Sequence, residues 1–175
     1  MSRFFGPMRQ IAFVVRDIRT AMDHWIAACG VGPWFFTEKA VTDAFLYKGE
    51  RHRLDLAVAL ANSGHMQLEL IQPNDDAPSM FRDFLSAGHE GMHHWCVWPD
   101  NYEELVSTAL SKGWMIGQQG ENERGRWVYF LSNGHPGTLV EVSEPTPLRS
   151  QINEIVRRAA LDWDGTDPRR PWPIV

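Results

Sequence analysis

The sequence NSGHMQLELIQP at residues 62–73 returns in a related form as NGHPGTLVEVSEP at residues 133–145. Both stretches contain a Gly-His pair, then a run with the alternation of a β-strand, and then a proline. Each run carries one glutamate between aliphatic neighbours, Glu69 in the first and Glu141 in the second. A charge inside a half-buried strand is unfavourable unless it is paired or coordinated. Because the chain repeats this unfavourable pattern, we expect the two glutamates to share a function.

The similarity extends back from these strands along both halves of the chain. Residues 10–15 (QIAFVV) and 94–99 (HWCVWP) each read as a short strand, followed by a candidate helix N-cap at Asp17 or Asn101. Three strand candidates follow each helix, at residues 34–38, 53–61 and 66–72 and at residues 114–119, 126–132 and 138–144. Both halves therefore predict a β-α-β-β-β module of the α+β class. Two such modules can enclose a cleft that one module cannot.

Two helices are predicted outside the modules. Residues 78–88 read as a connecting helix, and the chain after Pro147 has helical apolar spacing at Ile152, Ile155, Val156 and Ala159. The tail at residues 164–175 is too rich in proline for regular structure. Two alternatives are open: a loose terminus, or a tail that wraps over the body or a partner subunit with Trp172 as its anchor.

The expected organisation is one domain over residues 1–146, followed by a C-terminal helix and extended tail over residues 147–175. Within the domain, the first module covers about residues 8–73 and the second about residues 92–145.

Composition restricts the class of partner. The net charge of -5 disfavours nucleic acid, because phosphates require a basic face. No apolar run approaches the roughly 20 residues that span a bilayer, and the N-terminus lacks the apolar core of a secretory signal. We expect a cytoplasmic protein with two buried thiols, Cys29 and Cys96. The eight tryptophans are expected mostly in the core, with several lining a pocket for an apolar or aromatic ligand.

Four polar residues occupy matching places in the two modules. Gln10 and His94 begin the first strands, and Glu69 and Glu141 lie in the last strands. If both sheets curl toward one cleft, one amide oxygen, one imidazole and two carboxylates meet there. This donor set suits a divalent ion such as Zn, Ni, Co, Mn or Mg, with open positions for water or substrate. The alternative is that both glutamates lie on solvent-exposed faces of their strands.

The module repeat, together with the runs GMHHW at residues 91–95 and GHPGTLVEVSEP at residues 134–145, resembles the vicinal oxygen chelate superfamily. The resemblance is to its glyoxalase I and methylmalonyl-CoA epimerase branch and covers about residues 8–145. It implies a glyoxalase-type open barrel around one cleft, a homodimer, and a metal held by Gln10, Glu69, His94 and Glu141. Epimerases of this branch have His at the position of Gln10, whereas zinc-dependent glyoxalase I has Gln, Glu, His and Glu in this order.

The resemblance implies a metal-dependent isomerase or epimerase. It would move a proton at a carbon adjacent to a carbonyl through an enolate, on an apolar or aromatic small molecule, with Glu141 as leading base and Glu69 as its partner. Alternatives are a glyoxalase-like lyase and a non-catalytic binding or resistance protein of the same fold. Val14 and Pro73 stand where glyoxalase I has glutathione-binding Arg and Asn, so glutathione adducts are not expected. Dioxygenase chemistry is disfavoured because the dioxygenase set of two histidines and one glutamate is absent.

The remaining polar residues favour structural roles. His93 is predicted on the opposite strand face from His94. Arg124 and Arg126 are predicted in a solvated hairpin turn, with the clamping of an acidic group as the alternative. Trp98 and Trp127 are predicted in the core or on the cleft wall.

Overall fold

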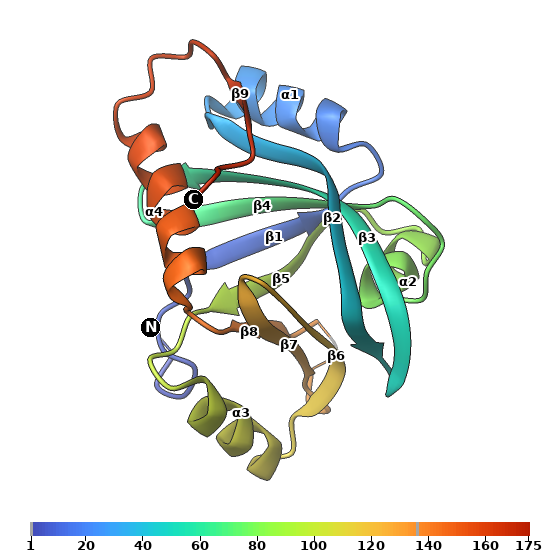
Figure 1. Ribbon diagram of the computed structural model, residues 1–175. Coiled ribbons are helices and arrows are strands. Elements are labelled where there is room, and N and C mark those ends of the chain that lie inside the picture. Colours follow the sequence, from blue (N-terminus) through green and yellow to red (C-terminus); the bar gives the residue numbers. More distant parts are fainter. Residues whose placement is uncertain (1, 136) are drawn as a thin grey trace.

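A computed structural model describes residues 2–135 and 137–175 of the chain. Its elements, labelled in Figure 1, are β1 Gln10–Val14, α1 Ile18–Cys29, β2 Trp34–Tyr47, β3 Glu50–Ser63, β4 Met66–Pro73, α2 Met80–Ser86, β5 Gly91–Val97, α3 Tyr102–Ser111, β6 Met115–Asn122, β7 Gly125–Leu131, β8 Leu139–Ser143, α4 Pro147–Leu161 and β9 Arg169–Pro171. The predicted β-α-β-β-β order is present in both halves.

The strands form one curved sheet with the order β3-β4-β1-β5-β8-β7-β6-β2-β9. The first strands of the modules, β1 and β5, pair antiparallel at its centre, and each pairs in parallel with the last strand of its own module. β2 is bonded to both β3 and β6, so the sheet curls round until the outer strands of the two modules meet. The predicted fold class, α+β with two modules around one cleft, is confirmed (Figure 1).

Strand alternation divides the side chains between the outer and inner faces of the sheet. Leu68 and Leu70 of β4 are buried in a cluster with Met22 of α1. Val140 and Val142 of β8 are buried in the corresponding cluster under α3. Burial of such an aliphatic side chain contributes about 1.5–3 kcal/mol, which fixes the faces of both strands. Glu69 and Glu141, which alternate with these residues, therefore face the interior of the curved sheet.

The helices begin where the sequence predicts. The Asp17 carboxylate accepts hydrogen bonds from the backbone N–H groups of Arg19 and Thr20 at the start of α1. The Asn101 side chain accepts from the N–H of Glu104 at the start of α3. These caps satisfy donors that a helix leaves free in its first turn.

Two helices cover the interior of the curved sheet. Phe81 and Leu85 of α2 pack among inner-face residues, which closes one end. Ile152 and Val156 of α4 pack against Leu60 of β3. Ile155 lies at the edge of this face and is 37% exposed, so it is less buried than its neighbours on the face.

The C-terminal tail is more ordered than its proline content predicts. Residues 169–171 form β9, which pairs in parallel with the start of β2. Trp34 donates its backbone N–H to the carbonyl of Pro168. Pro168 therefore joins the pairing as an acceptor, which does not require the N–H that proline lacks. Trp172 packs against the cluster between α4 and β3, so its expected anchoring role is confirmed.

Two further expectations change. β2 has 14 residues and reaches far beyond the predicted residues 34–38. Its full length was not predicted because two register shifts in its pairing with β3 interrupt the period-two pattern. Cys29 is exposed, whereas Cys96 is buried. Among the described residues, none of the helices combines the length and apolar character required to cross a membrane.

Candidate functional site

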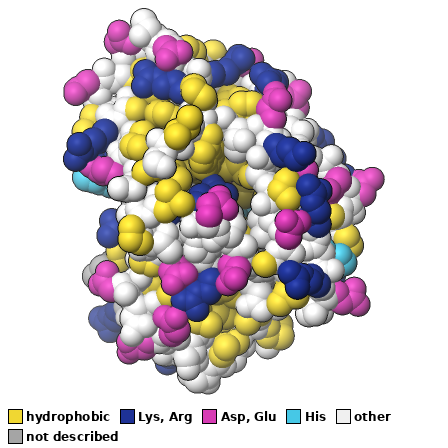
Figure 2. All heavy atoms as spheres, viewed as in Figure 1, with side chains coloured by type: hydrophobic (Ala, Val, Ile, Leu, Met, Phe, Trp, Pro, Cys, Tyr) yellow, Lys and Arg dark blue, Asp and Glu magenta, His cyan; other side chains and the backbone are white. Residues whose placement is uncertain are grey.

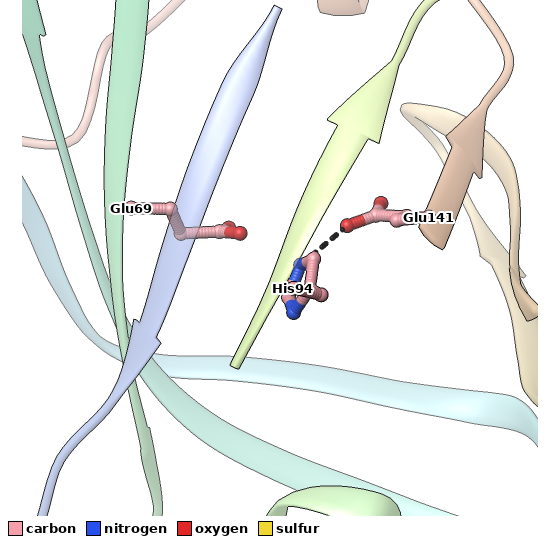
Figure 3. A group of neighbouring side chains, drawn as sticks. All are labelled: Glu69, His94 and Glu141. Carbon is pink, nitrogen blue, oxygen red and sulfur yellow. Dashed lines mark hydrogen bonds and ion pairs between the residues drawn. The ribbon is translucent and has the colours of Figure 1, made fainter. Parts of the chain in front are cut away.

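Three of the four predicted ligands converge inside the curved sheet. Glu69 comes from β4, His94 from β5 and Glu141 from β8, and one ligand atom of each lies within 4.8 Å of the other two. Figure 3 shows the Glu69 carboxylate directed across β1 toward the other two side chains. His94 Nε2 lies 2.9 Å from Glu141 Oε2. Strand register explains this meeting, since Ala12 of β1 is paired with both Glu69 and His94.

Glu141 is held in place through both of its oxygens. One oxygen contacts His94, and the other accepts a hydrogen bond of 2.5 Å from the Ser143 hydroxyl. That hydroxyl accepts in turn from Arg149 Nη1 at 2.5 Å. Burial acts to raise the pKa of Glu141, but His94, Ser143 and Arg149 together outweigh it and lower this pKa. Glu141 is therefore kept ionised.

Glu69 has the opposite behaviour. Burial, followed by the charge of Glu141, raises its pKa from 4.5 to about 8. Without a bound cation, Glu69 keeps a proton near neutral pH while Glu141 does not. Two carboxyl groups with pKa values moved apart in this way are suited to act as an acid and a base.

Gln10 is buried beside this cluster. Its amide Nε2 donates to Gln67 Oε1 at 2.8 Å, and Gln67 Nε2 donates to Asn153 Oδ1 at 3.3 Å. No residue in the described ranges donates to the amide oxygen of Gln10, which lines the same cavity as Glu69 and Glu141. The oxygen is thus available as a fourth donor beside the group of three.

The donor set fits a divalent cation. One imidazole nitrogen and carboxylate oxygens are common zinc ligands with bonds of about 2.0–2.2 Å, so two ligand atoms on one ion lie at most roughly 4.4 Å apart. The spacing between His94 and Glu141 is already within this limit. The three ligand atoms lie within 4.8 Å of one another, so torsional adjustment of the glutamate side chains brings all three to one ion.

His93 does not point to the opposite face as predicted. The register between β1 and β5 passes from His94 to Met92, so a bulge at His93 interrupts the alternation. The two imidazole rings then approach, with Nδ1 atoms 3.0 Å apart. Burial, and next the neighbouring His94, lowers the pKa of His93 to about 3. A neutral His93 is therefore placed to fix the orientation of the His94 ring.

A cavity of about 110 Å³ adjoins the carboxylates. Its wall is mainly aliphatic and aromatic, with tryptophans at Trp98, Trp127 and Trp172, so the predicted tryptophan wall is present. Gly120 makes room for one of them, since a Cβ there would lie 2.6 Å from the Trp127 ring. Figure 2 shows apolar side chains lining a hollow between α4 and β2, with charged side chains at its edge.

Several cavity residues were missed in the sequence. Tyr129 faces Glu141 across β7 and β8 and lies 4.8 Å from the His94 ring, centroid to centroid. Tyr129 is two residues from Trp127 on β7, so it lies on the same strand face, and this spacing could have predicted it. Ser143 follows Glu141 by two residues and so shares its face, which was a second signal. No sequence pattern pointed to Arg149, because its place depends on how α4 docks.

The two arginines of the β6–β7 hairpin have different surroundings. Arg126 is bound by Glu103 at 2.5 Å and Glu144 at 2.7 Å, in agreement with a solvated turn. Arg124 instead lines the cavity. The prediction of a solvated turn is therefore wrong for Arg124, and its alternative, a clamp for an acidic group, is taken up below.

Comparison with known proteins identifies the family. A family model described as Glyoxalase/Bleomycin resistance protein/Dioxygenase superfamily matches residues 9–130, which is more than half of the chain. The chain belongs to this superfamily. The matched range contains Gln10, Glu69 and His94, while Glu141 follows it. No curated protein sequence matches the chain.

Solved structures share the fold at low sequence identity. Methylmalonyl-CoA epimerase from Mycobacterium tuberculosis is 14% identical with a TM-score of 0.62, and the match covers 86% of this chain and 95% of the epimerase. A hypothetical protein from Bacillus halodurans C-125 is 16% identical with a TM-score of 0.61, over 80% of this chain and 94% of that one. A Streptomyces coelicolor methylmalonyl-CoA epimerase is 16% identical with a TM-score of 0.54, over 81% and 95%. These similarities extend to the fold and not to the reaction.

Proposed function

We propose that this protein is a metal-dependent isomerase or epimerase that moves a proton at a carbon adjacent to a carbonyl. The observation that carries the proposal is the convergence of Glu69, His94 and Glu141 beside a mainly apolar cavity. In this proposal Gln10, Glu69, His94 and Glu141 hold one divalent ion, such as Zn, Ni, Co, Mn or Mg. A bound ion of this kind stabilises negative charge on a carbonyl oxygen.

The chain's own residues supply the proton transfer. Glu141 is kept ionised by His94, Ser143 and Arg149, so it is the group suited to accept a proton from carbon. Glu69 comes from the other module, with a carboxylate oxygen within 4.8 Å of Glu141, and is proposed as the group that returns a proton. The aliphatic and tryptophan wall lowers the polarity of the cavity, which strengthens electrostatic interactions there.

Two alternatives use the same cleft. A glyoxalase-like lyase would share the metal and both carboxylates. A non-catalytic binding or resistance protein would use the cavity alone and would not need two carboxylates directed at one point. We expect no turnover of the methylglyoxal–glutathione adduct, because Val14 and Pro73 replace the glutathione-binding residues of glyoxalase I and neither lines the cavity.

The expected setting follows from the family. We propose a small-molecule carbonyl substrate, a homodimer as the assembly, and a cytoplasmic location, with neither nucleic acid nor a membrane as partner. The net charge of -5 supports the absence of a nucleic-acid partner.

The test is deuterium exchange from solvent into the acidic carbon of carbonyl compounds, with phenylpyruvate as a first probe. Purified protein of measured metal content should catalyse the exchange. Glu141→Gln keeps an oxygen donor but removes the base, so the rate should fall about 10²–10⁴-fold at equal metal content. Glu50→Gln is the matched control, since the Glu50 side chain is 83% exposed.

The alternatives give different results in this assay. Exchange by wild type at the rate of the Glu141→Gln variant would remove Glu141 as the base. If metal-loaded wild type binds carbonyl compounds but exchanges deuterium into none of them, the protein is a binding protein. Robust turnover of the methylglyoxal–glutathione adduct would establish the lyase.

A further inference from the structure

Arg124 has donors that the protein does not use. Its side chain is 23% exposed, and its ion-pair partner is the adjacent Glu123, whose oxygen lies 3.8 Å from Nε and whose side chain is 73% exposed. Within residues 2–135 and 137–175, its guanidinium makes no hydrogen bond to a protein acceptor. A half-buried guanidinium normally has its planar set of donors paired.

The position of Arg124 is nevertheless fixed. Its Cζ lies 5.1 Å from the ring centroid of Trp172, a cation–π distance. Its backbone carbonyl accepts from Arg149 Nε at 3.1 Å and from the Thr146 hydroxyl at 2.8 Å. The guanidinium is thus held on the cavity wall by groups that leave its N–H donors free.

Arg149, the second arginine on this wall, is already occupied. It donates to Ser143 Oγ at 2.5 Å, to the carbonyl of Arg124 at 3.1 Å and to the carbonyl of Gly125 at 3.5 Å. Arg149 therefore supports Glu141 through Ser143, whereas Arg124 has capacity for a ligand.

The charges around the cavity also favour an anion. Its charged lining residues are two carboxylates and two arginines. The lining has a net positive charge when a divalent cation is bound to both carboxylates. Arg124 lines the same cavity as Glu69 and Glu141, so an anion at Arg124 would share that cavity with the reacting groups.

We infer that Arg124 binds a carboxylate of the ligand, so that the cavity selects small organic acids with an apolar body. This inference rests on the proposed function, because it takes the cavity beside Glu69 and Glu141 as the substrate site. A planar carboxylate matches the paired donors of a guanidinium, and the aliphatic and tryptophan wall matches the apolar body. Arg124 is then the specificity-determining residue of the site, and it lies opposite the C-terminal Trp172.

The test compares two ligands of one shape that differ in charge, 3-phenylpropanoate and 3-phenylpropanamide, by titration calorimetry on the full chain as purified. Wild type should bind the acid about 10- to 100-fold more tightly than the amide, as expected for a charge-assisted hydrogen bond. Arg124→Met should weaken the acid by this factor and leave the amide unchanged. Arg158→Met is the matched control, because the Arg158 side chain is 73% exposed on α4, outside the cavity lining.

Equal affinity for the acid and the amide in wild type would overturn the inference, as would no binding of the acid at about 1 mM. This comparison needs no variant, so misfolding of Arg124→Met would not hide the answer. A preference that survives in folded Arg124→Met would overturn the assignment to Arg124. Neither compound has a ketone to enolise, so the calorimetry tests this inference alone, and the deuterium exchange assay on carbonyl compounds tests the proposed function separately. A carboxylate preference in calorimetry, together with no exchange into any carbonyl compound, would refute the proposed function and leave this inference standing.

Discussion

Replacing Glu69 by Gln should stabilise the metal-free protein at high pH. The pKa of Glu69 is about 8 in the folded chain against an ordinary value of 4.5, because of burial and the charge of Glu141. At a pH between these two pKa values, Glu69 keeps its proton in the folded state and has lost it in the unfolded state. The folded state therefore binds more protons, and its stability falls as the pH rises.

The size of the effect follows from the same two pKa values. At 1.36 kcal/mol for each pH unit, the ionised Glu69 would cost the folded state at most about 5 kcal/mol. Glu69 is only partly buried, so solvent screening lowers this cost and we expect about 2–4 kcal/mol. Glu69→Gln removes this cost. The variant and wild type should be similarly stable at pH 5, and the variant should be more stable by this amount at pH 9.

The assay is urea unfolding of chelator-treated protein at several pH values from 5 to 9. Taking the difference between variant and wild type cancels titrating groups common to both, such as His93. Glu50→Gln, at a side chain that is 83% exposed, should reproduce the wild-type pH dependence. The reasoning is refuted if the difference between Glu69→Gln and wild type does not grow with pH, or if it grows equally in the control.

Two further predictions concern residues that support the site. Ser143→Ala removes the hydroxyl between Glu141 and Arg149, so urea unfolding at pH 7 should show a free energy of unfolding lower by about 1.5–3 kcal/mol. The difference from wild type should shrink in acid, because protonation of Glu141 weakens the same hydrogen bond in wild type. A difference independent of pH would contradict the role assigned to the ionised carboxylate. Trp172→Ala should destabilise the fold by about 1–3 kcal/mol in thermal unfolding and speed proteolysis of residues 162–175, whereas Ile174→Ala, at a 98% exposed side chain, should do neither.

The sequence predicts what depends on neighbours along the chain. The inward direction of Glu69 follows from Leu68 and Leu70, whose burial under α1 fixes the strand face. The N-caps at Asp17 and Asn101 are likewise local. The internal repeat adds a prediction about residues far apart in the chain: equivalent strands of the two modules face a common interior.

Local sequence patterns do not predict contacts between segments that are far apart in the chain. Arg149 reaches Ser143 only because α4 docks beside β3, and that docking depends on packing between side chains far apart in sequence. The bulge that brings His93 to His94 arises from a mismatch between β1 and β5, which neither strand shows alone. The large apolar side chain of Trp172 made it a candidate anchor for the tail, but its contact with Arg124 could not be predicted from the sequence.

The cavity is assembled from residues inside and outside the range that matches the family model. Gln10, Glu69 and His94 lie within the range that matches the family model, residues 9–130. Part of the opposite wall comes from α4 and from Trp172 after β9, both beyond that range. Substitutions in residues 147–172 therefore change the shape and charge that a ligand meets while the imidazole and both carboxylates stay on their strands. Sequence changes in this C-terminal appendage would therefore change which ligands the cavity accepts without replacing any of the four candidate metal ligands.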